Sequence, residues 1–347
     1  MTTTPSPRAR VTAVALAAAL LAAVAVVYTV RASERNAPAA PDASGITLTT
    51  TPGLYVRTDA GTVSVVPTEG GRKAPRTEDG REATRTEDAR EATGLACRRF
   101  YAAGGTAVCL TTVPGIPPRT QAVVLDSALR PKRTVTFGGT PNRARVSPSG
   151  RVISWTVFVS GDSYAGSAFS TRSGILDTRT GYLIKNMETV QLSIDGRRYS
   201  APDVNYWGIT FSRDDNRFYA TVSTRGRTYL VEGDLKKWTA RALRENVECP
   251  SLSPDGTRLA YKKRVRTGTT SPWRLHVLDL RTMRDTPLAE ARSVDDQAAW
   301  LDDATLAYAL PGATRDASDV WSVRADGTGT PRLVAHDASS PSMVPPA

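Results

Sequence analysis

Short apolar runs separated by polar turns are the dominant pattern of this chain beyond its N-terminal region. The clearest example is the segment 253–261, SPDGTRLAY, in which the polar turn SPDG precedes the apolar run LAY. Asp-Gly favours a tight turn because glycine adopts positive φ values without strain and Asp hydrogen-bonds to nearby backbone. The pattern therefore predicts a β-hairpin.

Weaker copies of this hairpin recur at residues 146–155, 211–219 and 300–308. A further strand that ends in a polar turn occurs six times, at residues 63–66, 122–126, 174–178, 228–234, 273–279 and 319–327. Hairpins repeated at a spacing of roughly forty to sixty-five residues are typical of a propeller or a similar array. We therefore predict an all-β fold, a six-bladed β-propeller of four-stranded antiparallel blades.

The N-terminal region has a different pattern. Residues 11–30 consist of Val, Ala and Leu except for Thr12, Tyr28 and Thr29. About twenty apolar residues in a helix span a membrane, whereas the apolar part of a cleaved signal peptide has only about 7–15. We predict one N-terminal transmembrane helix; cleavage as a signal sequence, which would give a secreted protein, is the alternative. Arg8 and Arg10 precede the span and favour a cytoplasmic N-terminus, with the C-terminal domain extracytoplasmic.

These patterns divide the chain into a cytoplasmic lead at 1–10, the anchor at 11–30, a Pro/Ala-rich tether at 31–45, the propeller at 46–335 and a C-terminal tail at 336–347. Within the propeller, residues 69–94 contain the near-identical peptides RTEDGREAT and RTEDAREAT. Mixed charge with almost no apolar residue cannot fill a core, so we predict a charged, disordered insertion there.

The chain has three cysteines and two histidines. A turn near Ala103 would place Cys97 and Cys109 opposite each other on paired strands, and we predict a disulfide; two reduced core cysteines are the alternative. A disulfide persists in oxidising compartments, in agreement with an extracytoplasmic domain. Cys249 is left over as a buried thiol. Three cysteines without supporting histidines make no metal site, so we expect neither metal nor cofactor.

The formal net charge of +11 raises the question of nucleic-acid binding. Most of the positive charge is Arg scattered along the chain, without the dense basic runs and interleaved aromatics of nucleic-acid sites, so we expect no such partner. The Arg- and Ala-rich composition is typical of actinobacterial proteins. Attraction to anionic envelope polymers stays open.

The segment SPDGTRLAY, together with SPSG at 147–150, resembles the propeller repeat of TolB-like, WD-repeat-like proteins. The resemblance covers residues 46–335 and implies a six-bladed β-propeller used mainly for protein–protein contact in an extracytoplasmic space. TolB itself has an additional N-terminal α/β domain and is soluble in the periplasm. Here a membrane span and a short tether precede the propeller, which indicates a membrane-anchored type, and the Arg- and Ala-rich composition indicates an actinobacterial one.

In propellers, the loops that lead into the innermost strands gather around one mouth of the central channel. The residues predicted at that mouth are Asn142, Arg143, Asn205, Tyr206, Trp207, Glu248, Asp295, Asp296 and Gln297. Aromatic residues and Arg dominate binding hot spots, so this set is a candidate recognition site. Alternatively, Tyr206 and Trp207 pack between blades.

We expect a non-catalytic, membrane-tethered module that binds an unidentified protein partner. The segment 161–165, GDSYA, resembles a nucleophile elbow, but it lies in a polar loop and lacks a histidine partner, so we expect no enzyme. Two alternatives stay open. One is a small-molecule-binding, glycan-binding or enzymatic propeller that uses the carboxylates Glu248, Asp295 and Asp296, and the other is a structural cell-envelope protein.

Overall fold

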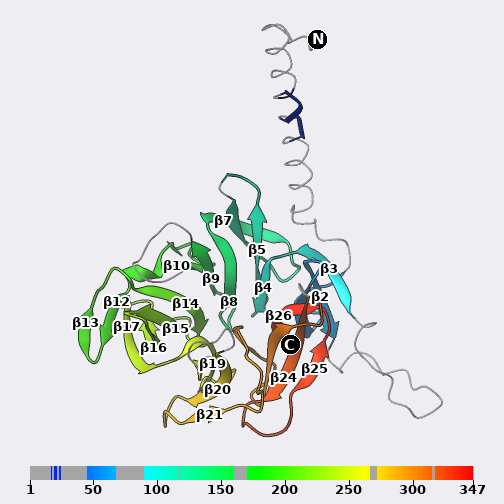
Figure 1. The fold of residues 1–347 in the computed structure, drawn as a ribbon. Helices are drawn as coiled ribbons and strands as arrows, with labels where there is room; N and C mark the ends of the chain where they lie inside the picture. Colours follow the sequence, from blue (N-terminus) through cyan, green and yellow to red (C-terminus); the bar gives the residue numbers. More distant parts are fainter. Residues whose placement is uncertain are drawn as a thin grey trace, which may run out of the picture.

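Six β-sheets surround a central channel in the computed structural model, so the predicted six-bladed β-propeller is confirmed (Figure 1). The structure describes residues 17, 19–21, 23–24, 45–67, 90–116, 118–159, 170–265, 272–314 and 317–346. The innermost strands contact one another in order around the ring, and the last of them returns to the first.

Five of the blades are four-stranded antiparallel sheets, whose strands follow one another from the channel outward. Blade 1 contains β26 (Ala338–Val344), β1 (Gly53–Thr58), β2 (Thr62–Pro67) and β3 (Glu91–Ala96); blade 2 contains β4 (Arg99–Ala103), β5 (Thr106–Val113), β6 (Arg119–Leu125) and β7 (Pro131–Gly138). Blade 3 contains β8 (Thr140–Val146), β9 (Val152–Val159), β10 (Ser170–Asp177) and β11 (Leu183–Ile184). Blade 5 contains β18 (Glu248–Leu252), β19 (Arg258–Arg264), β20 (Trp273–Asp279) and β21 (Asp285–Pro287); blade 6 contains β22 (Ala299–Trp300), β23 (Thr305–Pro311), β24 (Ser318–Arg324) and β25 (Arg332–Ala335).

Blade 4 is wider than the predicted four strands. It contains β14 (Asn205–Phe211), β15 (Arg217–Thr224), β16 (Arg227–Asp234) and β17 (Thr239–Glu245), and its outer edge adds β12 (Gln191–Ile194) and β13 (Arg197–Tyr199). Strand β12 pairs in parallel with β17 and follows the short 3₁₀ helix η1 (Met187–Thr189). Met187 and Leu192 are buried in the core of this blade, which holds the added edge in place.

A separate apolar cluster lies at every junction between neighbouring blades. Strand β5 shows how one strand serves two clusters. Its residues Ala107 and Cys109 face blade 1, whereas Val108 and Leu110 face blade 3. Successive side chains of a strand point to opposite faces. Because both faces of a blade are covered, the strands read as continuous apolar runs rather than as polar–apolar alternation.

The repeated hairpins keep one backbone geometry although their sequences differ. Gly150 and Gly256 have φ values of 78° and 75°, and Asp215 occupies the corresponding position in blade 4 with a φ of 54°. Asp is one of the few residues that tolerates this left-handed conformation. The side chain of Asp214 accepts hydrogen bonds from the backbone of Asn216 and Arg217, which stabilises the turn without glycine.

Three predicted segments differ from the structure or lie outside its described part. Residues 338–344, predicted as part of a tail, form β26 and close blade 1. The sequence ASSPSMV has no apolar pattern that would predict a strand. The strand is held instead by hydrogen bonds of its serine side chains, such as those of Ser342 with the backbone of Ala102. Residues 91–94 of the predicted insertion belong to β3, and the rest of it falls largely outside the described residues. The predicted anchor at 11–30 also lies almost wholly outside them, and no helix within the described part is long and apolar enough to cross a membrane.

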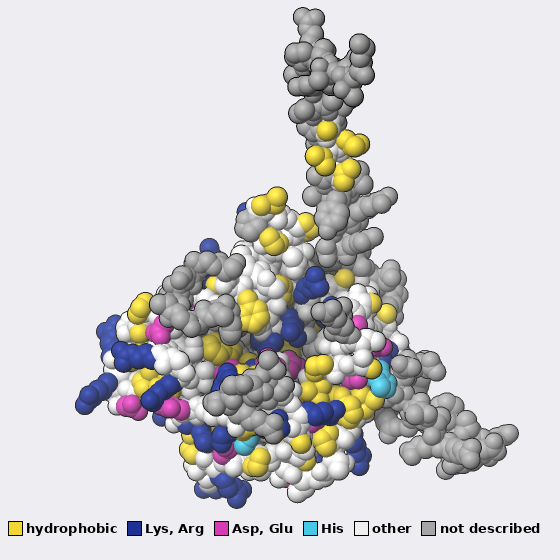
Figure 2. Space-filling view, viewed as in Figure 1, with side chains coloured by type: hydrophobic (Ala, Val, Ile, Leu, Met, Phe, Trp, Pro, Cys, Tyr) yellow, Lys and Arg dark blue, Asp and Glu magenta, His cyan; other side chains and the backbone are white. Residues whose placement is uncertain are grey.

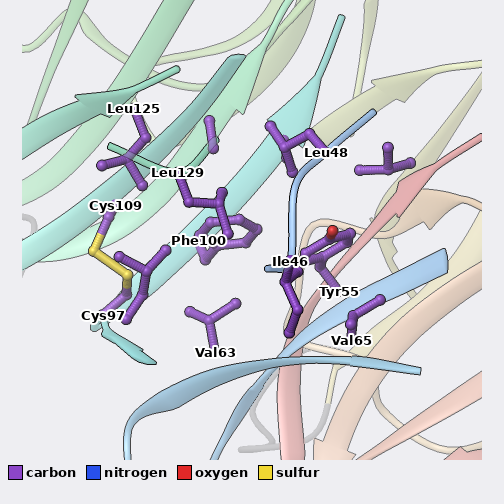
Figure 3. Close-up of a cluster of buried hydrophobic side chains, with 14 of the residues drawn as sticks. Ile46, Leu48, Tyr55, Val63, Val65, Cys97, Phe100, Cys109, Leu125 and Leu129 are labelled. Atoms are coloured by element: carbon purple, nitrogen blue, oxygen red, sulfur yellow. A yellow bond between two sulfur atoms is a disulfide. The ribbon is translucent and has the colours of Figure 1, made fainter. Parts of the chain in front are cut away.

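The predicted disulfide is present. Cys97 and Cys109 are joined with their Cα atoms 5.4 Å apart. Figure 3 shows the bond beside Leu125, Leu129 and Phe100, in the cluster between blades 1 and 2. The bond therefore ties the start of β4 to β5, next to the strand that closes the ring.

Ser342 provides a test of ring closure. It is fully buried on β26; its hydroxyl accepts a hydrogen bond from the Ala102 amide at 2.9 Å and donates one to the Ala102 carbonyl at 3.0 Å. Ser342→Ala removes the hydroxyl that pairs with the amide and the carbonyl of Ala102. We therefore expect the free energy of unfolding, measured in urea, to fall by about 1–3 kcal/mol. Ser322→Ala on β24 is the matched control, with an expected change within about 0.5 kcal/mol. Equal losses in the two variants would contradict a special role for this contact.

Reduction of the disulfide gives a second prediction. In the chain-entropy model, opening so short a loop lowers the stability by about 3 kcal/mol. A thermal melt with and without reductant should show a lower Tm in reductant. The double variant Cys97→Ala, Cys109→Ala should melt at the same temperature in both buffers. A wild-type Tm that is unchanged by reductant would contradict the expectation.

Candidate binding site in the central channel

The connections between blades orient the channel. Each four-stranded meander ends where its own first strand began, so the innermost strands all run in the same direction along the axis. Their starting ends carry Arg99, Asn142 and Glu248 and form what we call the polar mouth. Their finishing ends carry Phe211 and Leu252 and form what we call the apolar basin.

The structure brings six of the predicted site residues together at the polar mouth: Asn142, Arg143, Glu248, Asp295, Asp296 and Gln297. Arg143 donates to the Asp295 carbonyl at 3.3 Å, and Gln297 donates from its side chain to the Pro250 carbonyl at 2.8 Å. The segment before β22 thus contacts the innermost strands of blades 3 and 5. Figure 2 shows basic and acidic side chains gathered near the centre of the propeller.

The other three predicted residues have different environments. The Asn205 side chain accepts hydrogen bonds from the Ser170 hydroxyl and the Thr171 amide, and so ties β14 to β10. Tyr206 is fully buried in the apolar cluster of blades 3 and 4, as in the alternative interpretation. Burial raises the pKa of its hydroxyl. Trp207 is half-buried on β14, opposite Thr221.

Lys262 organises the carboxylates of the polar mouth, although it is not among the residues that the sequence predicts. Its ammonium lies 2.5 Å from an oxygen of Asp295, 3.7 Å from Glu248 and 4.3 Å from the centre of the Trp273 ring. The Lys262 side chain is buried, whereas that of Asp295 is 70% exposed. Lys262 follows the apolar run LAY on a buried strand, and a charged residue in such a place needs a partner. Its position directly after this run is therefore the feature of the sequence that could have identified Lys262.

Burial and charge act against each other in this group. Burial raises the pKa of Glu248, and Lys262 opposes that rise only in part. Burial alone would lower the pKa of Lys262, but the neighbouring Cys249, Asp295 and Glu248 outweigh it and raise the pKa. Burial would likewise raise the pKa of Asp295, yet Lys262 and Arg143 hold it below its usual range. The mouth therefore contains an ion-paired lysine between two carboxylates.

Three arginines converge deeper in the channel. Arg99 on β4 and Arg143 and Arg145 on β8 line a small cavity of about 20 Å³ with Asn142, Asp296, Gln297 and Ser340. Burial, together with the charge of Arg143, lowers the pKa of Arg99 to about 10. Burial also lowers the pKa of Arg145. Asp296 is the one acid that lines this cavity within the described chain.

The apolar basin is much larger, at about 480 Å³. Every innermost strand contributes to its lining, which includes Tyr101, Phe211, Leu252, Trp300, Met343 and Pro345. None of these belongs to the predicted site. The repeated hairpin is the feature of the sequence that could have predicted the basin. Its turns follow innermost strands, so the turns that contain Pro148 and Pro254 lie at the same end of the channel.

Each histidine of the propeller lies beside an aspartate. No group of three or more His, Cys, Asp and Glu residues that could hold a metal ion is found among the described residues. His276 lies 2.8 Å from Asp285, on β20 and β21, and His336 lies 3.3 Å from Asp319. The elbow-like segment 161–165 lies outside the described residues.

Lys262→Met tests the electrostatics of the mouth. Loss of the ammonium leaves Glu248 buried without its partner, and we expect the stability at neutral pH to fall by about 3 kcal/mol. Without Lys262 the pKa of Glu248 rises further. A carboxyl with a raised pKa stabilises the fold below its unfolded pKa and loses that contribution as the pH rises through its folded pKa. The stability lost in Lys262→Met should therefore be smaller at about pH 4 than at neutral pH. Urea denaturation of the wild-type protein and the variant at several pH values measures this difference.

The double variant Lys262→Met, Glu248→Gln is the control for that measurement. It removes the carboxyl group with the raised pKa, so the pH dependence should become smaller, and the part that remains belongs to Asp295, whose pKa Lys262 lowers. A loss in Lys262→Met that is the same at every pH would show that Glu248 does not carry the effect.

Comparison with known proteins supports the fold. No protein-family model matches the sequence, and no curated protein matches it either. The structure is similar to TolB from Acinetobacter baumannii, with a TM-score of 0.55 and 14% identity over 84% of this chain and 66% of that one. A protein assigned as TolB from Agrobacterium tumefaciens gives a TM-score of 0.49 and 13% identity over 85% and 93% of the two chains. A puromycin-hydrolyzing peptidase from Mycobacterium tuberculosis gives 0.44 and 16% over 72% and 41%.

The chain spans slightly less than two thirds of the A. baumannii TolB chain. At this level of identity the likeness is one of fold. The predicted resemblance is confirmed to that extent: the chain forms a six-bladed β-propeller whose fold is similar to that of TolB.

Proposed function

We propose that this protein is a non-catalytic, extracytoplasmic propeller that binds a segment of a partner protein at its central channel. Residues 11–30 would tether it to the cell membrane. The observation that carries the proposal is the apolar basin, a preformed hollow to which all six innermost strands contribute. The TolB-like fold supports a protein-interaction role at a coarse level.

The disulfide supports the extracytoplasmic location. A bond such as that between Cys97 and Cys109 persists where the compartment is oxidising. The apolar sequence of residues 11–30 supports a tether, since its length matches the thickness of a membrane. A secreted form without the tether would present the same channel.

The basin has the size and lining of a binding pocket. Pockets for ligands commonly measure about 300–1,000 Å³ and are mainly apolar. At about 480 Å³, this basin accommodates one or two large side chains of a partner. Phe211 and Trp300 are buried in its wall, and the Trp300 indole donates to the Ser251 carbonyl at 2.8 Å, so the wall is rigid before binding.

The carboxylates at the opposite mouth pair with a buried cation. Asp295 and Glu248 share Lys262 and are held as ion-pair partners. A lysine in so buried a position needs such partners. The arrangement supports a structural role for this group at the polar mouth.

In-cell photo-crosslinking tests the proposal. A photoreactive residue at Pro345, on the exposed rim of the basin, should capture one recurrent protein, identified by mass spectrometry. Met343→Asp places a negative charge in the basin and should abolish that capture, because an apolar segment would then meet a desolvated carboxylate. The same photoreactive residue at Arg133, exposed on the outer strand β7, is the control and should capture no enriched protein.

Two results would contradict the proposal. One is the same diffuse background from Pro345 and from Arg133. The other is a protein captured from Asp295 at the polar mouth and not from Pro345, which would place the contact at the opposite end and favour the carboxylates as the binding groups.

A further inference from the structure

Arg145 joins the two cavities of the channel. It lines the small polar cavity and also the inner end of the apolar basin. Its guanidinium carbon lies 4.3 Å from the centre of the Tyr101 ring, and one terminal nitrogen donates to the carbonyls of Gln297 at 3.1 Å and Ala298 at 2.7 Å. The group is thus fixed in place by an aromatic ring and two backbone oxygens.

The hydrogen-bonding capacity around Arg145 is not filled. Arg145 is only 6% exposed, yet its Nε has no hydrogen-bond partner among the described residues. The same is true of Nε of Arg143 and of the side-chain oxygen of Gln297, which is 3% exposed. Buried donors are normally paired, so the two unpaired Nε–H groups indicate a place for an acceptor atom of a ligand, whereas the Gln297 oxygen is itself an acceptor and does not contribute to binding an anion.

The charge of the cavity selects an anion. Within the described chain, none of Arg99, Arg143 and Arg145 has a carboxylate oxygen within salt-bridge distance. Asp296, the acid of the cavity, accepts a hydrogen bond from the Ala309 amide at 3.2 Å. Three cations and one carboxylate therefore line the cavity, and Asp295 beside it offsets part of the charge of Arg143. The remaining positive excess lies where water is largely excluded, so that its attraction for an anion is weakly screened.

The sizes of the two cavities define the shape of that ligand. The polar cavity, at about 20 Å³, has room for about one water-sized group. A sugar, a nucleotide or a phosphate ester is too large for it, whereas the end of a carboxylate fits. The basin on the other side of Arg145 takes an apolar body. Both hydrogens of one terminal nitrogen of Arg145 are donated to backbone carbonyls, so its unpaired Nε–H is a donor left for one oxygen of a carboxylate, in a charge-assisted hydrogen bond.

We propose that the channel recognises an apolar carboxylate, whose body fills the basin and whose carboxylate is bound by Arg145. In a polypeptide this chemistry belongs to a C-terminal residue with a large apolar side chain. This inference rests on the proposed function, and it specifies the partner segment as a free, apolar C-terminus. A fatty acid has the same chemistry, and the experiment separates the two sources.

Calorimetric titration of the full-length protein tests the proposal with three probes. These are the peptide acetyl-Ala-Ala-Phe with a free carboxylate, the same peptide with a C-terminal amide, and decanoate. The acid should bind at least about tenfold more tightly than the amide, which corresponds to about 1.4 kcal/mol. Arg145→Met should remove this difference. Arg133→Met, which alters an exposed arginine on β7, should keep it.

A second variant guards against misfolding of Arg145→Met. Pro345 is exposed at the rim of the basin, so Pro345→Asp adds a negative charge without opening the core. It should weaken binding of the acid more than binding of the amide, because like charges repel.

The outcomes are distinct. Equal binding of acid and amide would overturn carboxylate recognition and leave a peptide-binding function standing. Binding of decanoate that depends on Arg145, with no binding of either peptide, would support the apolar carboxylate and contradict the protein partner. No binding of any probe at millimolar concentration would overturn the inference.

Discussion

The C-terminal strand β26 pairs with β1, and this sheet joins the two ends of the propeller. Every apolar cluster lies between two blades, so an open ring would leave the faces of blades 1 and 6 exposed. The buried Ser342 hydroxyl then fastens β26 to β4 through both backbone groups of Ala102. Closure also completes the channel, because β26 supplies Ser340 to the polar cavity and Met343 to the basin.

The closed ring produces a channel with two chemically different ends. The polar mouth holds its charges in pairs, with buried Lys262 between Glu248 and Asp295. The basin is apolar and preformed, and Arg145 lies between them. Burying an arginine without a salt bridge is costly, and here an aromatic ring and backbone carbonyls offset only part of that cost. A ligand carboxylate would supply the missing partner, which connects the energetics of the fold to binding.

Much of the fold can be predicted from the sequence because turn chemistry is local. Asp255-Gly256 predicts its hairpin, and Cys97 and Cys109 face each other across a turn that their spacing defines. Strand β26 could not be predicted, because it is stabilised by a hydrogen bond between Ser342 and Ala102, two residues that are far apart in the sequence. The basin was missed for the same reason: Tyr101, Trp300 and Met343 are distant in sequence and meet only after the ring closes. Asp295 and Gln297 lie at one mouth of the channel because the topology of a propeller places such loops there; whether they bind a partner stays a prediction. Tyr206, on strand β14, is instead buried in the core.

A crystal structure of the protein with N-acetyl-L-phenylalanine is the most direct test of the channel as a binding site, since this probe combines one aromatic side chain with a free carboxylate. We expect the ring to lie in the basin beside Phe211 and Trp300. We also expect a carboxylate oxygen to lie about 2.7–2.9 Å from a nitrogen of Arg145. An empty channel with the probe bound elsewhere on the propeller would contradict the claim that this channel is the binding site.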